Sequence, residues 1–113
     1  NNPVVVETNA LSLDDNLAIP TYFALHQNYP NPFNPSTQIS FDIPEGFEFV
    51  TLNVYNILGK KVNTLLNKPM NPGKHKVEWN AKDSEGNPVA SGIYFYELNT
   101  PSFTARKKML LIR

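Results

Sequence analysis

Apolar and polar residues alternate along most of the chain after residue 24. This two-residue period is typical of β-strands that bury one face. Residues 38–43 and 50–54 each place three apolar side chains on one side. Further strands are expected at residues 62–66, 75–79, 93–98 and 103–112. In the strand at 75–79, Trp79 is in phase with Val77, which predicts that the indole lies in the core.

Turn-forming residues separate these segments and suit antiparallel connections. Gly59, after Ile57 and Leu58, predicts a hairpin turn in which glycine supplies a positive φ. Residues 44–46 and 71–73 combine proline with glycine, and residues 83–88 form a polar loop. About seven short strands at a spacing of roughly 8–12 residues, with no helical stretch, indicate an all-β fold. We therefore expect an antiparallel immunoglobulin-like or fibronectin-like β-sandwich over residues 24–113.

The sandwich assignment leaves one aromatic question open. Tyr94 or Tyr96 could form a tyrosine corner, in which the hydroxyl binds the backbone a few residues upstream. Alternatively, either ring is a core aromatic whose hydroxyl reaches the rim of the sandwich.

The first 23 residues show no comparable period. They are interpreted as a linker or peripheral segment that follows an upstream passenger domain. The absence of an initial methionine leads to the same expectation, that the chain is a piece of a longer protein.

Composition excludes several kinds of chemistry. The 113 residues contain no cysteine, so disulfides, thiolate metal sites and cysteine catalysis are excluded. Ten Lys and Arg balance ten Asp and Glu, so no nucleic-acid partner is expected from global charge. Neither histidine has metal-ligand spacing: His75 is predicted to pack within or beside a strand, and His26 to make a surface hydrogen bond. No nucleophile motif is present, so we expect no enzymatic activity and no cofactor.

One loop could carry a cation. Asp83, Glu85 and Asn87 offer oxygen atoms of the kind that Ca²⁺ prefers, although the same residues are also typical of an ordinary turn. The sequence leaves these two interpretations open.

Two segments at opposite ends of the domain are more specific. The first is a proline-rich run, which cannot be helical and predicts a rigid bend leading into a strand, with its phenylalanine closing the end of the sandwich. It consists of Tyr29, Pro30, Asn31, Pro32, Phe33, Asn34 and Pro35. The second is residues 106–113, four cations and four apolar residues that place positive charge on both faces of the last strand. Such lysines either block sheet-to-sheet pairing at an edge or present the strand to a receptor, for example by strand addition.

Together these segments resemble the type A C-terminal sorting domain of the type IX (Por) secretion system of Bacteroidetes, an immunoglobulin-like, hook-capping-like sandwich. The proline run resembles its opening motif. Residues 54–62 with Gly59, 73–80, 90–96 with Gly92 and Tyr94, and 107–113 resemble its later motifs, in order. The resemblance covers about residues 25–113.

The resemblance implies a function without catalysis. Such a domain directs a passenger protein through the periplasm and across the outer membrane to the cell surface or medium. The implied partners are the outer-membrane translocon, its shuttle and sortase proteins, with cleavage and surface anchoring in some cases. The residues implied in recognition are Lys107, Lys108, Met109, Leu110, Leu111, Ile112 and Arg113.

Two alternatives accompany this interpretation. A non-catalytic carbohydrate-binding or spacer module of a secreted glycoside hydrolase would use exposed rings. Candidates are Tyr22, Phe23, Tyr29, Phe33, Phe47, Tyr55 and Trp79. Pairing of uncapped edge strands could also join two copies of the domain into a homodimer.

Overall fold

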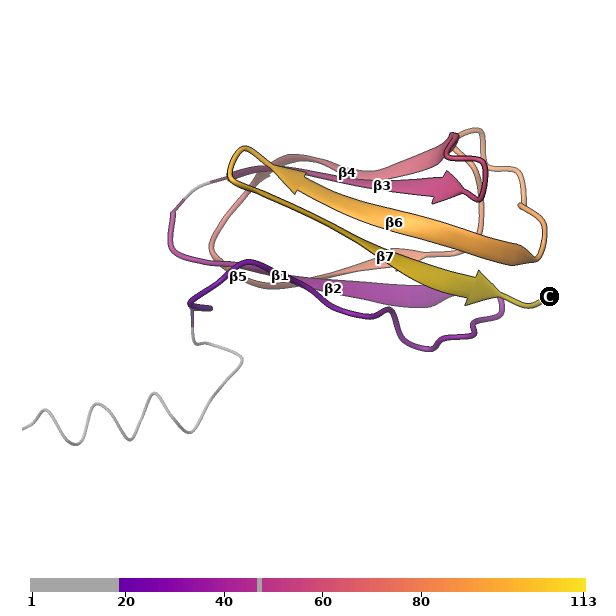
Figure 1. The fold of residues 1–113 in the computed structure, drawn as a ribbon, viewed down its shortest axis with the longest axis horizontal. Coiled ribbons are helices and arrows are strands. Elements are labelled where there is room, and N and C mark those ends of the chain that lie inside the picture. The colour runs from indigo at the N-terminus through magenta and orange to yellow at the C-terminus, as the bar shows by residue number, and fades with distance from the viewer. Residues whose placement is uncertain (1–18, 47) are drawn as a thin grey trace, which may run out of the picture.

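A computed structural model describes residues 19–46 and 48–113, which form seven strands in two layers (Figure 1). The strands are β1 (Ala24–Leu25), β2 (Thr37–Ile43), β3 (Glu48–Asn56), β4 (Lys61–Met70), β5 (Gly73–Trp79), β6 (Gly92–Thr100) and β7 (Phe103–Leu111). Within these two ranges, no helix is long and apolar enough to cross a membrane.

All strand pairs are antiparallel. One sheet has the order β1-β2-β5 and the other the order β4-β3-β6-β7. The predicted seven-stranded immunoglobulin-like sandwich is thus confirmed. Most strands extend beyond the predicted limits, and β4 in particular continues to Met70, where the sequence predicted an end near residue 66. Pro69 is compatible with this extension because β4 is an edge strand.

The core lies between the inner faces of the two sheets and follows the predicted alternation. The apolar residues of β2 and β3 that share one face are fully buried: Ile39, Phe41, Ile43, Val50, Leu52 and Val54. Trp79 is also buried, as predicted, and its indole N–H donates to the carbonyl of Lys82 at 2.9 Å. Because the ring buries its polar atom with a partner, it can fill the core without leaving a donor unsatisfied.

Tyr94 and Tyr96 divide the two predicted roles between them. The Tyr94 hydroxyl donates to the carbonyl of Ala90 at 2.6 Å, four residues upstream, which is the pattern of a tyrosine corner. The Tyr96 hydroxyl donates at 2.6 Å to the carbonyl of His26. His26 directly follows β1, so this hydrogen bond links β6 to the opposite sheet.

Tyr96 gives the domain an expected sensitivity to alkaline pH. Burial raises the pKa of its hydroxyl from 10.0 to about 12. Between these values the unfolded chain loses this proton while the folded domain keeps it, so the free energy of unfolding should fall as pH rises. We expect a full loss of about 3 kcal/mol, given about 1.4 kcal/mol for each pKa unit, of which about 2 kcal/mol is reached by pH 12. Urea unfolding at pH 9, 10, 11 and 12 would measure it.

The matched variant for that measurement is Tyr96→Phe. It should be less stable at pH 9, because the His26 carbonyl loses its donor, yet it should show a much shallower slope above pH 10. A small slope should persist, since burial also raises the pKa of Tyr94. An unchanged slope in the variant would contradict the assignment to Tyr96.

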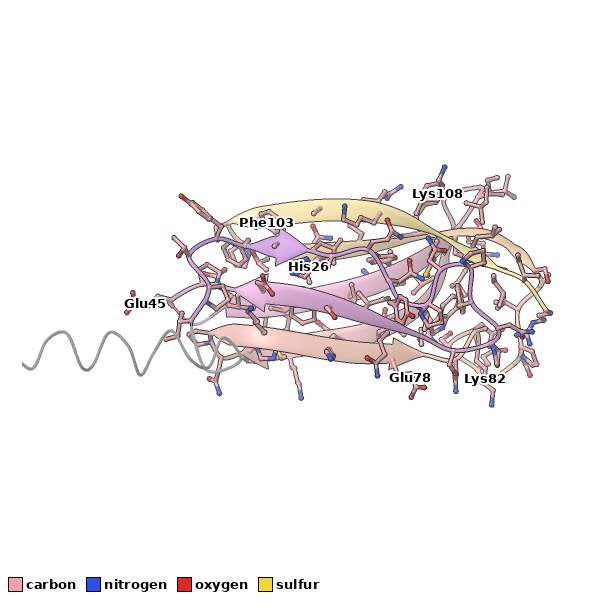
Figure 2. The ribbon with its side chains drawn as sticks, turned by 90° about the horizontal axis from the view of Figure 1, so that it is seen from below. His26, Glu45, Glu78, Lys82, Phe103 and Lys108 are labelled. Carbon is pink, nitrogen blue, oxygen red and sulfur yellow. The ribbon has the colours of Figure 1, made fainter. Side chains whose placement is uncertain are left out.

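The connections between the strands lie at two opposite ends of the molecule. The C-terminus, the β3–β4 turn, the β5–β6 connection and the proline run lie at one end, which we call the distal end (Figure 1). The start of the described chain and the β4–β5 and β6–β7 turns lie toward the other end. Figure 2 shows Lys82 and Lys108 toward the distal end, and Glu45 and Phe103 toward the other.

The predicted linker at residues 1–23 lies almost entirely outside the described residues. At its border, the Phe23 ring stacks on Phe103 with centroids 5.0 Å apart and planes 9° from parallel. The chain therefore already packs against the sandwich one residue before β1 begins.

Candidate functional site

The proline run lies along the outer edge of the terminal strand. The Phe33 amide donates to the carbonyl of Leu110, and the Ile112 amide donates to the carbonyl of Phe33, both at 3.0 Å. This is a parallel bridge between Phe33 and Leu111. The two segments that stood out at opposite ends of the sequence are thus hydrogen-bonded to each other.

Side chains extend this contact along β7. The Asn31 Oδ1 atom accepts a hydrogen bond from the Leu110 amide at 3.0 Å. The Gln27 Nε2 atom donates to the carbonyl of Lys108 at 2.7 Å. The edge of β7 is therefore closed from residue 108 to residue 112 by the loop between β1 and β2 and not by another strand, which blunts it against pairing.

A buried polar network fixes the shape of the proline run. Asn28 and Thr37 are both buried, and the Asn28 Nδ2 atom donates to the carbonyl of Pro30 at 3.1 Å and to the Thr37 Oγ1 atom at 2.9 Å. The Thr37 hydroxyl donates to the same Pro30 carbonyl at 2.9 Å. These two side-chain donors satisfy the Pro30 carbonyl and hold the run in place, in a segment whose prolines have no backbone N–H to donate. The roles of Asn28, Gln27 and Thr37 were not predicted from the sequence, where the only signal was polar residues flanking the prolines.

Phe33 anchors the run in the core. It is 2% exposed, and its ring centroid lies 5.8 Å from that of Trp79 at an angle of 54°. The prediction that this ring closes the end of the sandwich is confirmed.

The predicted recognition residues of β7 divide between its two faces. Met109 and Leu111 are buried in the core, and Lys107 is half-buried on the same face. On the other face Lys108 is exposed, Leu110 is partly exposed and Ile112 is 50% exposed. In this fold Met109 and Leu111 cannot contact a partner directly, whereas the second set can. The recognition role of the segment stays a prediction.

Arg113 fixes the end of the chain on the β5–β6 connection. Its guanidinium donates to the carbonyls of Val89 at 2.8 Å and Ala81 at 3.0 Å. Its amide donates to the Ser91 hydroxyl at 2.9 Å. The predicted strand addition or dimerisation at β7 would therefore have to use the edge before residue 108, or else displace the proline run.

The β3–β4 turn is rigid and displays two apolar side chains. Gly59 has the predicted positive φ, +85°, and its amide donates to the Asn56 carbonyl at 2.9 Å. The Asn56 Oδ1 atom accepts from the amides of Leu58 at 2.9 Å and Lys60 at 3.0 Å. Ile57 and Leu58 are 67% and 87% exposed, so the turn holds both side chains in solvent.

The two histidines behave as predicted and do not meet in one site. The His26 ring is exposed and lies 3.0 Å from the Asp42 carboxylate. The His75 ring stacks on Phe41 at 5.3 Å and lies 2.8 Å from the carbonyl of Asn71. Among residues 19–46 and 48–113, no group of three or more His, Asp or Glu residues is placed to hold a metal ion.

The loop considered for calcium uses its carboxylate internally. The Asp83 Oδ1 atom accepts hydrogen bonds from the amides of Glu85 and Asn87, each at 2.9 Å. This is the local turn that the sequence offered as the other interpretation.

The aromatic candidates for sugar binding do not form a platform in the described part of the chain. Trp79 and Phe33 are buried, and the Arg106 guanidinium lies 5.1 Å from the centre of the Tyr55 ring. Tyr22 and Tyr29 are exposed but come from different segments. Phe47 lies outside the described residues.

Solved structures that share this fold include three bacterial proteins. PorZ of Porphyromonas gingivalis, described as an essential surface component of the type IX secretion system, is 22% identical, with a TM-score of 0.55 over 80% of this chain and 12% of its own. Latent dimeric PorU from the same organism is 21% identical, with a TM-score of 0.64 over 85% of this chain and 10% of its own. FlgD of Pseudomonas aeruginosa is 20% identical, with a TM-score of 0.53 over 82% of this chain and 74% of its own.

The chain thus spans about a tenth of the length of the two P. gingivalis proteins. At these identities the structures establish a common fold. No curated protein sequence matches significantly. The model of the FlgD Ig-like domain family matches residues 28–102, which is more than half of the chain, and the chain belongs to that family.

Proposed function

We propose that this domain is a non-catalytic sorting signal of the type IX secretion system. It would direct an upstream passenger through the periplasm and across the outer membrane, and a sortase would then release or anchor the passenger at the cell surface. The translocon and its shuttle protein would recognise the domain at its distal end.

One observation carries the proposal. The proline run and the terminal strand, the two segments most specific to the sorting-domain resemblance, are hydrogen-bonded into one unit. Because the loop already caps the edge of β7 from residue 108 to residue 112, the exposed Lys108 beside it is not needed to block strand pairing there. The shared fold with PorZ, from a type IX secretion system, is consistent with this role.

A reporter experiment tests the proposal. A signal peptide and a fluorescent protein are placed before the full 113-residue chain and expressed in a bacterium with a type IX system. We expect the reporter on the surface or in the medium, and its retention in the periplasm of a strain that lacks the translocon. The matched control is the reporter without the domain, which should be retained in both strains.

Two outcomes would contradict the proposal. Equal export with and without the translocon would show that another route is used. Retention of the fused reporter in the intact strain, together with binding of the purified domain to insoluble polysaccharide, would favour a carbohydrate-binding module.

A further inference from the structure

The outer face of the four-stranded sheet has an apolar strip near the distal end. Ile93 on β6 pairs in register with Leu110 on β7, and both point away from the core because Tyr94 and Met109 are buried. Both are partly exposed. Ile112 continues the strip beyond β7, and Ile57 follows β3 at the same end. We call Ile57, Ile93, Leu110 and Ile112 the distal strip.

Cations surround the distal strip. Lys108, which alternates with Leu110 along β7, is exposed, and Lys61 pairs with Tyr55 at the start of β4. Arg106 lies over the rings of Tyr55 and Phe95, at 5.1 and 5.7 Å. The carboxylate beside them, Glu97, already pairs with Arg106 at 3.5 Å. The strip is therefore apolar in its centre and positive at its border.

These positions are largely preorganised. The Asn56 side chain holds the turn that carries Ile57, and the bonds to Phe33 and Asn31 hold Leu110 and Ile112. A rigid surface loses little conformational entropy on binding, which favours recognition by a partner of matching shape.

We infer that the distal strip docks onto a protein surface with an apolar centre and a border of carboxylates. This deepens the proposed function and rests on it, because that surface would belong to the secretion machinery that receives the domain. Recognition then involves three strands together, whereas the sequence pointed to the terminal segment alone.

The charge and shape of the strip disfavour two other occupants. A second copy in a two-fold contact would bring together two surfaces that both carry Lys61 and Lys108 at their border, and this like charge is unfavourable. A bilayer would require several side chains that penetrate it together, but Ile93 and Leu110, in the centre of the strip, lie half-buried on a sheet face, and only Ile57 and Ile112 at its ends are more exposed. A protein surface with an apolar centre and a border of carboxylates would complement both the apolar residues of the distal strip and the cations around it.

Surface variants of the reporter fusion test the inference. Ile112→Glu and Lys108→Glu change exposed side chains and leave the core intact. Matched controls, Gln38→Glu and Lys76→Glu, alter exposed residues on the three-stranded sheet. We expect export to fall by at least about tenfold for the strip variants, as for loss of an interface hot spot, with little change for the controls. Lys108→Arg should retain export, since it keeps the charge. Equal unfolding midpoints of the four Glu variants would establish that folding is unaffected.

Each outcome has a distinct meaning. Normal export of folded strip variants would overturn the docking surface and leave the proposed function standing. Failure of the unmodified domain to export the reporter would overturn both. Strip-dependent sedimentation of the purified domain with phosphatidylglycerol vesicles, or a dimer that Ile112→Glu dissociates, would replace the protein partner with a lipid or with a second copy.

Discussion

Replacing Phe33 with alanine is expected to lower the free energy of unfolding by about 3–5 kcal/mol, the usual cost of truncating a buried phenylalanine. Phe33 is 2% exposed and packs against Trp79 at the distal end. Phe33 itself lies outside the regular strands, so the cavity would open at the junction between the proline run and β7. Urea or guanidinium unfolding followed by tryptophan fluorescence would measure the change, because Trp79 is the only tryptophan.

Phe49 provides a matched control for this substitution. It is 49% exposed on β3, so Phe49→Ala should change stability by no more than about 1 kcal/mol. A comparable loss in both variants would contradict the anchoring role of Phe33.

Amide exchange separates anchoring from general packing. The amides of Leu110 and Ile112 donate to Asn31 and Phe33, respectively. In Phe33→Ala the exchange of these two amides should accelerate more than the loss of global stability alone explains. The exchange of amides in β3 and β6 should accelerate only in proportion to that loss. Uniform acceleration across the domain would show that the ring supports the core but does not hold the cap on β7.

The strands and most of the core could be predicted from the sequence because both depend on local periodicity. Alternation over five to seven residues decides which side chains of a strand share a face. Val50, Leu52 and Val54, for example, are buried as the pattern predicts. Turn residues such as Gly59 could be predicted for the same reason, since a positive φ is a property of one residue.

The candidate site could be predicted only in part because its contacts are not local. Gln27 and Lys108 are 81 residues apart, and Asn31 and Leu110 are 79 apart. The sequence indicated that both segments were specific, but nothing in it showed that one caps the other. Burial of Met109 and Leu111 likewise depends on which face of β7 meets the second sheet.

The distal strip illustrates the same limit. Alternation in the sequence decides on which face of β6 Ile93 lies and on which face of β7 Leu110 lies. Only the sheet order β4-β3-β6-β7 makes these residues neighbours and brings the β3–β4 turn to the same end. The proposed docking surface would therefore be formed by β6, the end of β7 and the β3–β4 turn together, and not by one linear segment.

Deleting residues 107–113 is expected to unfold most of the domain. The deletion removes the buried side chains of Met109 and Leu111, each of which would cost about 2–5 kcal/mol if truncated to alanine. It also removes half of the β6–β7 ladder and the carbonyl and amide that bind Phe33. A domain of this size has only about 5–15 kcal/mol of stability, so the sum is comparable to the whole. Loss of chemical-shift dispersion in the NMR spectrum of the deletion variant would show the unfolding.

This expectation changes how loss of export after deletion should be interpreted. If the deleted domain is unfolded, its failure to export the reporter shows only that a folded domain is needed, because an exposed recognition residue and a core residue are removed together. Ile112→Glu and Leu111→Ala separate the two causes: the first alters the exposed face, and the second weakens the core by about 2–5 kcal/mol without touching that face. In Leu111→Ala, export should fall only in proportion to the fraction of unfolded domain. If that is observed, and if Ile112→Glu is folded but not exported, recognition lies on the exposed face of β7. A deletion variant that keeps its dispersed spectrum and unfolding midpoint would contradict the structural role of Met109 and Leu111.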